Sequence, residues 1–240
     1  MNLQFFAYRR LARWITCVLG VEGGTISLQS KYDVASFQDV FCQPFYWQMF
    51  QLLNECPKLI VDCGANCGHF SILADICCRT KFGEPDSEFI LVEPNPYLIP
   101  VIERNLKNSG ISSRASIRHA LLGEKTGAAS LWINKSNFLA SSMSEAANTK
   151  KYDIPFLDME QAVGERSIDL MKIDIEGGEF NFVRSNLNLF ERVKLLFIEV
   201  HDAPLNVQRD MFASLETKGL FEIVRPINAH GFQLAVLGRR

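Results

Sequence analysis

The stretch Leu59–Phe70, LIVDCGANCGHF, places the chain in one class of fold. It opens with a continuous apolar run, which is typical of a parallel strand buried on both faces. Asp62 ends this run, and a turn of small residues follows, with glycines at positions 64 and 68. The next residues, HFSILADICCR, favour a helix. This strand, turn and helix predict an α/β fold in which a ligand lies against the bare backbone of the turn.

The turn itself limits which ligand it can hold. A dinucleotide fingerprint GxGxxG starting at Gly64 needs glycines where the chain has Asn66 and His69, and the phosphate loop GxxxxGK[ST] is also missing. Asp62 would repel a phosphate, whereas it suits a ligand that carries an ammonium or another cation. Glycine at 64 permits backbone dihedrals that other residues avoid, and Gly68 lets the following helix pack closely. The turn therefore predicts a nucleoside-like ligand with positive charge and no pyrophosphate.

Apolar strands alternate with helical stretches from residue 59 onward, which predicts βαβ units with right-handed crossovers. The expected strands cover residues 58–63, 88–93, 115–122, 128–134, 167–176, 193–201, 220–226 and 232–238. The last two form a hairpin with its turn at Asn228–Gly231, so we expect a mostly parallel seven-stranded sheet with a terminal antiparallel hairpin strand. The strand at 128–134 is a short extra one. The Ser-, Asn- and Ala-rich segment 134–151 is expected to be a loop over the carboxyl edge of the sheet, where such folds bind ligands.

Residues 1–58 are predicted to be a helical N-terminal extension, and residues 59–240 the ligand-binding catalytic domain. Within residues 1–20, the arginines at 9, 10 and 13 share one side of a helical projection and apolar residues share the other. The simplest interpretation is an amphipathic helix packed on the domain, and the alternatives are weak contact with a membrane surface or a homodimer contact. The extension and segment 134–151 are expected to determine which substrate binds beside this ligand.

Composition excludes several classes of protein. The 240-residue chain has 25 basic and 27 acidic side chains, and its net charge of −2 lacks the basic footprint of a nucleic-acid-binding protein. No apolar run is long enough to span a bilayer. Seven cysteines without a secretion signal predict a reduced, cytoplasmic protein. Cys63 and Cys67 lack further ligands at zinc-binding spacing, so no cysteine metal site is expected.

A second binding signal is Glu93, which closes the second strand in the sequence ILVEPNP, 29 residues after Gly64. A carboxylate in that place can accept hydrogen bonds from both hydroxyls of a ribose. Taken alone, an acid before Pro94 equally suits a helix N-terminus. Together with the glycine turn it favours the ribose, and Ala120 and Leu121 at the end of the third strand are then expected to border the adenine.

Five motifs in order, VDCGANCGHFSI, LVEPNP, ALLGEKTGAASL, IDLMKIDIEGGEF and LFIEVH, resemble those of the FkbM family over about residues 33–237. The runs KIDIEGGE and IEVH are the most specific part of this resemblance. It implies a class I, Rossmann-like methyltransferase that uses S-adenosylmethionine and releases S-adenosylhomocysteine. It further implies methylation of a hydroxyl on a sugar, a lipid-linked glycan or a natural product. Cys63 and Cys67 replace the commoner Val and Ile at packing positions, which leaves cofactor binding unaffected.

The motifs and the resemblance together name a set of expected cofactor contacts. They are Asp62, Gly64, Ala65, Asn66, Gly68, Glu93, Pro94, Asn95, Ala120, Leu121, Ser142 and Asp174. Ser142 lies in the segment where the family often has small polar residues, and an ordinary solvated loop is the alternative for that residue.

The candidate catalytic residues follow two strands of the predicted sheet. Asp174 ends the fourth strand, where contact with the methionine moiety or the acceptor is expected and helix capping is the alternative. Glu176 lies two residues later. Glu199 and His201 close the fifth strand and point to one face, so both can aim at one pocket, with His201 as general base or acceptor-orienting group. Asp174, Glu199 and His201 are alternatively the ligands of a divalent cation, for which manganese tolerates mixed oxygen and nitrogen ligands better than magnesium.

Two neighbouring charges have simpler expected roles. Lys172 shares a strand face with Asp174, which allows a local ion pair. Glu179 is expected in the first turn of the next helix, where its simplest role is to complement the helix dipole.

Three other functions compete with O-methylation. An N-methyltransferase on the same fold stays open, because nitrogen acceptors often need only positioning and a proton acceptor. A nicotinamide-dependent oxidoreductase is disfavoured by the missing glycines at 66 and 69. A non-catalytic binding protein is disfavoured by the intact Asp62, Gly64, Gly68 and Glu93.

Overall fold

The computed structural model describes residues 17–21, 24–83, 85–134, 141–142, 148–201, 203–224 and 233–239. Their strands form three sheets, of seven, three and two strands. None of the helices in these residues is both long enough and apolar enough to cross a membrane.

The central sheet has the order β11-β12-β10-β9-β3-β4-β5. Its strands are β3 (Leu59–Cys63), β4 (Glu88–Val92), β5 (Ala115–Arg118), β9 (Ile168–Ile173), β10 (Val193–Val200), β11 (Phe221–Val224) and β12 (Gln233–Gly238). The pairs from β5 to β10 are parallel, and β12 runs antiparallel to both of its neighbours. The predicted mostly parallel sheet with one antiparallel hairpin strand is confirmed, while the predicted turn at Asn228–Gly231 lies outside the described residues.

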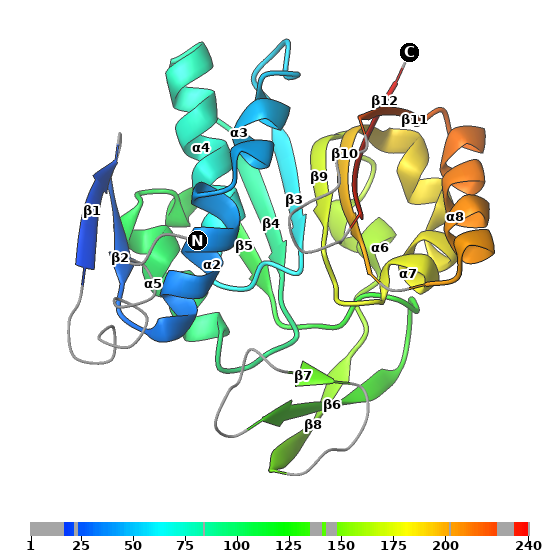
Figure 1. Ribbon diagram of the computed structural model, residues 1–240, viewed down its shortest axis with the longest axis horizontal. Helices are drawn as coiled ribbons and strands as arrows, with labels where there is room; N and C mark the ends of the chain where they lie inside the picture. The colour runs from blue at the N-terminus through cyan, green and yellow to red at the C-terminus, as the bar shows by residue number, and fades with distance from the viewer. Residues whose placement is uncertain are drawn as a thin grey trace.

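Helices cover both faces of this sheet (Figure 1). One face carries α2 (Lys31–Phe41), α3 (Pro44–Phe50), α4 (His69–Phe82) and α5 (Ile99–Asn108), and the other carries α6 (Met159–Val163), α7 (Glu179–Ser185) and α8 (Leu205–Thr217). Side chains of β3 alternate between the two faces of the sheet and contribute to both cores. Ile60 packs with the first set of helices, while Leu59 and Val61 pack with the second. The continuous apolar run in the sequence follows from this burial on two sides.

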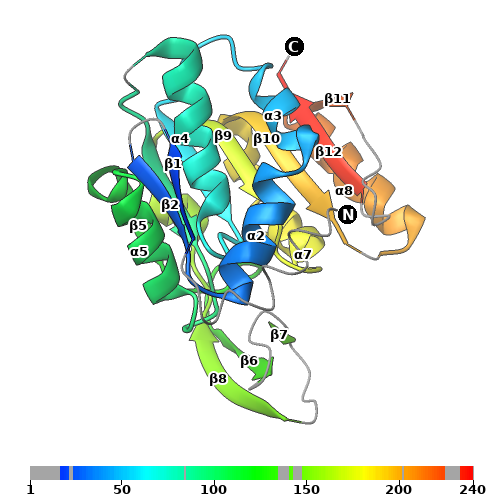
Figure 2. The same ribbon diagram turned by 60° about the vertical axis from the view of Figure 1, so that its left-hand side comes forward.

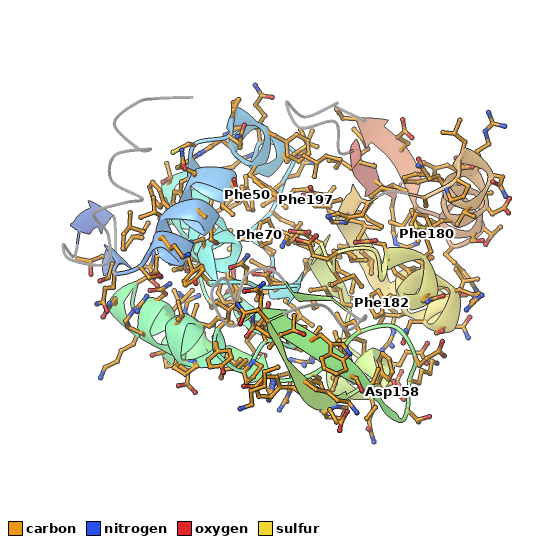
Figure 3. All side chains as sticks on the ribbon, turned by 60° about the horizontal axis from the view of Figure 1, so that its bottom comes forward. Phe50, Phe70, Asp158, Phe180, Phe182 and Phe197 are labelled. Atoms are coloured by element: carbon orange, nitrogen blue, oxygen red, sulfur yellow. The ribbon has the colours of Figure 1, made fainter. Side chains whose placement is uncertain are left out.

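The helices α2 and α3, which precede the first strand of the central sheet, complete the first of these cores. The ring centroids of Phe50 and Phe70 are 5.7 Å apart, and those of Phe50 and Phe197 are 5.9 Å apart. Figure 3 shows the three rings together, with Phe182 away from them. Residues from α3, α4 and β10 therefore share one apolar cluster.

A hairpin precedes α2 where a helix was expected. Cys17–Val21 forms β1 and pairs antiparallel with β2 (Gly24–Leu28), which lies beside α5 (Figure 2). The predicted amphipathic helix over residues 1–20 is therefore wrong for 17–20, and residues 1–16 lie outside the described part of the chain. In so short a run, valine and leucine are compatible with the periodicity of a helix or of a strand. Pairing with β2, which contains Thr and Ile, favours the strand.

A small sheet projects from one edge of the central sheet (Figures 1 and 2). It consists of β6 (Ala128–Asn134), β7 (Ser141–Ser142) and β8 (Thr149–Pro155), in the antiparallel order β7-β6-β8. The extra strand at 128–134 is confirmed, but the loop expected over 134–151 is wrong at 141–142 and 149–151. Pairing with β6 along its whole length holds β8 as a strand, although TKKYDIP carries two lysines and a proline.

The turn after β3 is built against the end of β9. Gly64 has φ of 79°, and a Cβ placed on it would lie 1.7 Å from the carbonyl oxygen of Asp174. The backbone N–H groups of Gly64 and Ala65 both donate to the carbonyl of Val92 at 3.0 Å. The glycine is therefore required by the neighbouring backbone of the protein itself, whereas the sequence suggested close approach of a ligand. Gly68, at φ of 78°, precedes α4 and packs against Ile102, as expected for close helix packing.

A buried acid joins α2 to α5. Asp33 is fully buried, and its Oδ1 accepts from the Arg104 guanidinium at 2.6 Å and from the Asn105 amide at 3.3 Å. Ser30 caps α2 by accepting from the N–H of Asp33.

Replacing Asp33 by Ala should lower the free energy of unfolding by about 3 kcal/mol, because it leaves the Arg104 charge and buried donors without their acceptor. Urea unfolding followed by circular dichroism measures this change. Asp86→Ala is the matched control, since the Asp86–Lys58 pair is exposed on both sides and its loss should leave the midpoint unchanged. Equal midpoints for Asp33→Ala and wild type would contradict the anchoring role.

Replacing Gly64 by Ala should destabilise the fold much more than the same change at Gly127. Both glycines have positive φ, but a Cβ at Gly127 has no atom within 4 Å, whereas at Gly64 it meets the Asp174 carbonyl. The Gly127→Ala protein should lose about 1–2 kcal/mol of stability from backbone strain alone. The Gly64→Ala protein should be insoluble, or lose at least twice as much in the same urea titration. Similar losses for the two variants would show that the turn can move away from β9.

Candidate functional site

Two adjoining pockets open at the carboxyl ends of β3, β4, β9 and β10. The first has a volume of about 140 Å³ and the second of about 300 Å³. They share three lining residues, Asn66, Asp174 and Glu176. A ligand in the first pocket would therefore contact a ligand in the second across this shared edge.

Glu93 dominates the polar end of the first pocket. It directly follows β4, and only 6% of it is exposed. Its Oε2 accepts from the backbone N–H of Asn66 at 2.8 Å, and its Oε1 accepts from that of Asn95 at 2.9 Å. Burial raises the pKa of Glu93 to about 7, although these two N–H groups and Lys172 act to lower it. Each oxygen keeps a free lone pair, so the carboxylate is placed to accept from two hydroxyl groups in the pocket.

The other end of the first pocket is apolar. Ala120 and Leu121, which were expected to border an adenine, line it. Leu98, Leu122 and Leu131 also line it, and sequence reasoning missed them. Leu131 comes from β6 in the small sheet, and nothing in the sequence indicates that this strand lies beside the ends of β4 and β5.

The remaining residues of the expected cofactor set divide between the pockets and the interior. Pro94 and Asn95 line the first pocket, and Ala65 lines the second. Gly68 lines neither pocket and serves the packing of α4. Ser142 lies in β7 opposite Trp132, and its side chain is outside the described part of the structure.

Asp62 lies behind the pockets, where the sequence suggested a contact with a cationic ligand. It is fully buried and lines neither pocket. Its Oδ2 accepts from the Ser71 hydroxyl at 2.8 Å, and its Oδ1 is 3.7 Å from Nζ of Lys172. Burial raises the pKa of Asp62, and the Lys172 charge opposes this. The nearby cation is therefore a lysine of the chain, which replaces the ligand ammonium that the turn suggested.

Lys172 joins the glycine turn to the end of β9. Its Nζ donates to the carbonyl of Gly64 at 2.8 Å and lies 3.0 Å from Oδ2 of Asp174, so the expected ion pair with Asp174 is present. Burial opposes the charge, but Asp174 and Asp62 outweigh it and raise the pKa of Lys172. The Gly64 carbonyl and Asp174 lie within hydrogen-bond distance of Nζ, and Asp62 adds a second negative charge at 3.7 Å, so Lys172 keeps its positive charge near neutral pH.

The second pocket is lined by aromatic rings, by carboxylates and by two basic side chains, Lys172 and His201. Phe45, Tyr46 and Phe70 supply aromatic rings, and the first two come from α3. Asp39, Glu176 and Glu199 supply carboxylates, and Ser36 and Gln43 add further polar groups. Residues from the predicted N-terminal extension therefore form much of this pocket.

Glu199 and His201 both line the second pocket, as their alternation on β10 predicted. Burial and then the Asp174 charge raise the pKa of Glu199 to about 7. His201 has its Nδ1 only 2.8 Å from Oε1 of Glu179, a fully buried carboxylate. Burial opposes charge on His201, but the hydrogen bond to Glu179 and the surrounding carboxylates outweigh it and raise its pKa to about 9.

The divalent-cation ligand set expected from the sequence is not brought together. Within the described residues, the His201, Asp174 and Glu176 side chains place ligand atoms within 4.8 Å of one another, and Glu199 is outside this group. Glu179 occupies Nδ1 of His201, and the carboxylates nearest to Nε2 are those of Glu176 at 3.4 Å and Asp174 at 3.8 Å. Glu179 thus has a larger role than complementing a helix dipole.

Comparison with known proteins is consistent with this geometry. Residues 62–234 match the model of the methyltransferase FkbM domain. No curated protein sequence matches the chain. An O-methyltransferase from Bacillus cereus, solved in complex with SAH, is similar in structure with a TM-score of 0.51 at 12% identity, and the match covers 82% of each chain. A precorrin-6y C5,15-methyltransferase from Geobacter metallireducens GS-15 gives a TM-score of 0.49 at 14% identity, over 82% of this chain and 88% of that one.

At these identities the solved structures bear on the fold alone, whereas the family match extends over most of the chain. The chain therefore has the class I, Rossmann-like methyltransferase fold and belongs to the FkbM methyltransferase family.

Proposed function

We propose that this protein transfers a methyl group from S-adenosylmethionine to a hydroxyl group of a sugar, a glycan or a natural product, and releases S-adenosylhomocysteine. The observation that carries the proposal is the meeting of two pockets at Asn66, Asp174 and Glu176. The first pocket suits the cofactor, and the second suits an acceptor.

The first pocket has groups that suit the ribose, the purine and the sulfonium of the cofactor. Glu93 offers both oxygens to a ribose, with the carboxylate fixed by the backbone N–H groups of Asn66 and Asn95. The apolar end at Ala120, Leu121 and neighbouring leucines suits a purine. The carboxylate of Asp174 at the shared edge suits a positive sulfonium. When bound, S-adenosylmethionine would supply an electrophilic methyl group.

In this proposal Glu199 removes the proton of the acceptor hydroxyl. It lines the second pocket, and none of the hydrogen bonds among the described residues ends on its carboxylate. With a pKa of about 7, Glu199 is ionised in a large fraction of molecules at neutral pH, and its carboxylate is basic enough to accept a proton. His201, with a pKa of about 9, is mainly protonated at that pH, so we assign it an orienting role in place of the base role expected from the sequence.

The walls of the second pocket bear on the class of acceptor. Rings of Phe45, Tyr46 and Phe70 can pack on the apolar face of a sugar or a polycyclic compound. The carboxylates of Asp39 and Glu176 can accept from hydroxyl groups of the acceptor.

Replacing Glu93 by Gln should weaken S-adenosylhomocysteine binding at least tenfold, because the charged acceptor for two hydroxyls is lost. In the wild type, the dissociation constant should rise about tenfold from pH 8 to pH 6, since binding needs the ionised carboxylate and a group with a pKa of about 7 becomes protonated over this range. Isothermal titration calorimetry measures both effects, and the pH dependence should be smaller in Glu93→Gln.

Glu88→Gln is the matched control, because Glu88 begins the same strand at its exposed opposite end. Its affinity should equal that of the wild type. Unchanged affinity in Glu93→Gln, or micromolar binding of NAD without binding of S-adenosylhomocysteine, would refute the proposed cofactor pocket.

Replacing Glu199 by Gln should lower turnover by about a hundredfold or more while S-adenosylhomocysteine affinity stays within about twofold, because the base is lost and the first pocket is intact. Turnover is measured as the release of S-adenosylhomocysteine when pools of monosaccharides, glycans or hydroxylated natural products are offered as acceptors. Mass spectrometry of the product identifies the methylated atom. Glu216→Gln, on the exposed side of α8, should behave as wild type. A loss below about tenfold would remove Glu199 from the base role.

A further inference from the structure

We propose that Glu179 is a positioning residue that holds His201 as an imidazolium, and that this imidazolium orients Asp174 and Glu176 at the edge shared by the two pockets. The inference rests on the proposed function, because the shared edge is where the cofactor and the acceptor would meet. It adds a role for Glu179 and replaces the base role of His201 by an electrostatic one.

The argument begins with the two ring nitrogens of His201. Nδ1 is 2.8 Å from Oε1 of Glu179, while Nε2 is 3.4 Å from Oε2 of Glu176 and 3.8 Å from Oδ1 of Asp174. A neutral imidazole has one donor and one acceptor nitrogen, so it would set a lone pair against a carboxylate on one side. The doubly protonated ring donates to Glu179 at Nδ1 and directs a positive Nε2–H toward the Glu176 and Asp174 carboxylates.

Glu179 is fixed in place by more than the histidine. It is the first residue of α7, is fully buried, and its Oε1 also accepts from the backbone N–H groups of Ile175 at 3.2 Å and Gly177 at 3.1 Å. One oxygen therefore holds both the turn after β9 and the ring after β10. Because Glu176 lies between these two N–H groups, Glu179 also fixes the turn that presents the Glu176 carboxylate, with Glu176 itself at φ of 54°.

The charges that face His201 come from four places in the fold. Asp174 comes from the end of β9, Glu176 from the following turn, Glu179 from α7, and Glu199 from β10, while Lys172 lies on the other side of Asp174. Among the described residues, these four carboxylates place negative charge around the ring. The pKa of His201, raised to about 9, agrees with the geometry.

Asp174 is the residue on which this arrangement acts. Its Oδ2 is 3.0 Å from Lys172 and its Oδ1 is 3.8 Å from Nε2 of His201, so one cation lies on each side of the carboxylate. A carboxylate held between two cations keeps one orientation toward the pockets. Glu179 contributes to the reaction through this orientation without touching the cofactor or the acceptor.

Nuclear magnetic resonance of ¹⁵N-histidine-labelled protein tests the inference. The chain has four histidines, and the spectrum of His201→Asn identifies the signals of His201. In the wild type, His201 should titrate well above its ordinary range, near pH 9, with both nitrogens protonated at pH 7. Glu179→Gln should lower this midpoint by about one pH unit or more, because the charged partner of Nδ1 is lost. Glu216→Gln, at an exposed position on α8, should leave the midpoint unchanged.

Three outcomes would overturn the inference. They are a wild-type midpoint at or below the ordinary histidine range, a Glu179→Gln midpoint equal to that of the wild type, and broadening of the His201 signals alone by micromolar Mn²⁺. The last would make the ring a neutral metal ligand. If Glu179→Gln does not fold, the wild-type titration and the Glu179→Asp variant decide the question. Calorimetry with S-adenosylhomocysteine on the same samples separates this result from the proposed function, because cofactor binding can fail while His201 titrates as expected.

Discussion

The contacts of a single buried ammonium group hold the site together. Lys172 reaches from β9 to the carbonyl of Gly64 and to the carboxylates of Asp62 and Asp174. Two carboxylates this close to each other and this far from water repel unless a cation lies between them. Because the same ammonium also binds the turn after β3, the position of that turn and the charge balance of the strand ends depend on one residue.

This dependence explains why the two pockets meet where they do. The turn after β3 packs on the carbonyl of Asp174, so the backbone of the first pocket is in direct contact with the end of β9. The acids at the strand ends then lie at the boundary between the pockets, and the two cations of the region, Lys172 and His201, lie on either side of Asp174. A region of this kind places charge where a positive sulfonium would meet a polar acceptor.

Much of the fold and part of the candidate site were predictable from the sequence, because they depend on local signals. The expected bounds of β3 and β4 agree with the structure to within one residue, and Glu93 and Leu121, which were expected to contact a ligand, line the first pocket. Contacts between distant segments were not predictable. Glu179 and His201 are 22 positions apart, and neither position signals that the two side chains meet. A strand such as β8 is stabilised by its partner more than by its own residues, which is why a loop was expected there.

The small sheet also constrains the shape of the first pocket, because one residue of β6 lines it. Leu131 faces the first pocket from the middle of β6, where it pairs with Tyr152 of β8, and Leu121 connects this sheet to the main one through its bridge to Phe156. Side chains alternate along a strand, so sliding β6 by a single residue would turn Leu131 away and present Ser130 or Trp132 to the pocket. The pairing of β6 with β8, outside the central sheet, thus contributes to the shape of the first pocket, in which the proposed function places the purine ring.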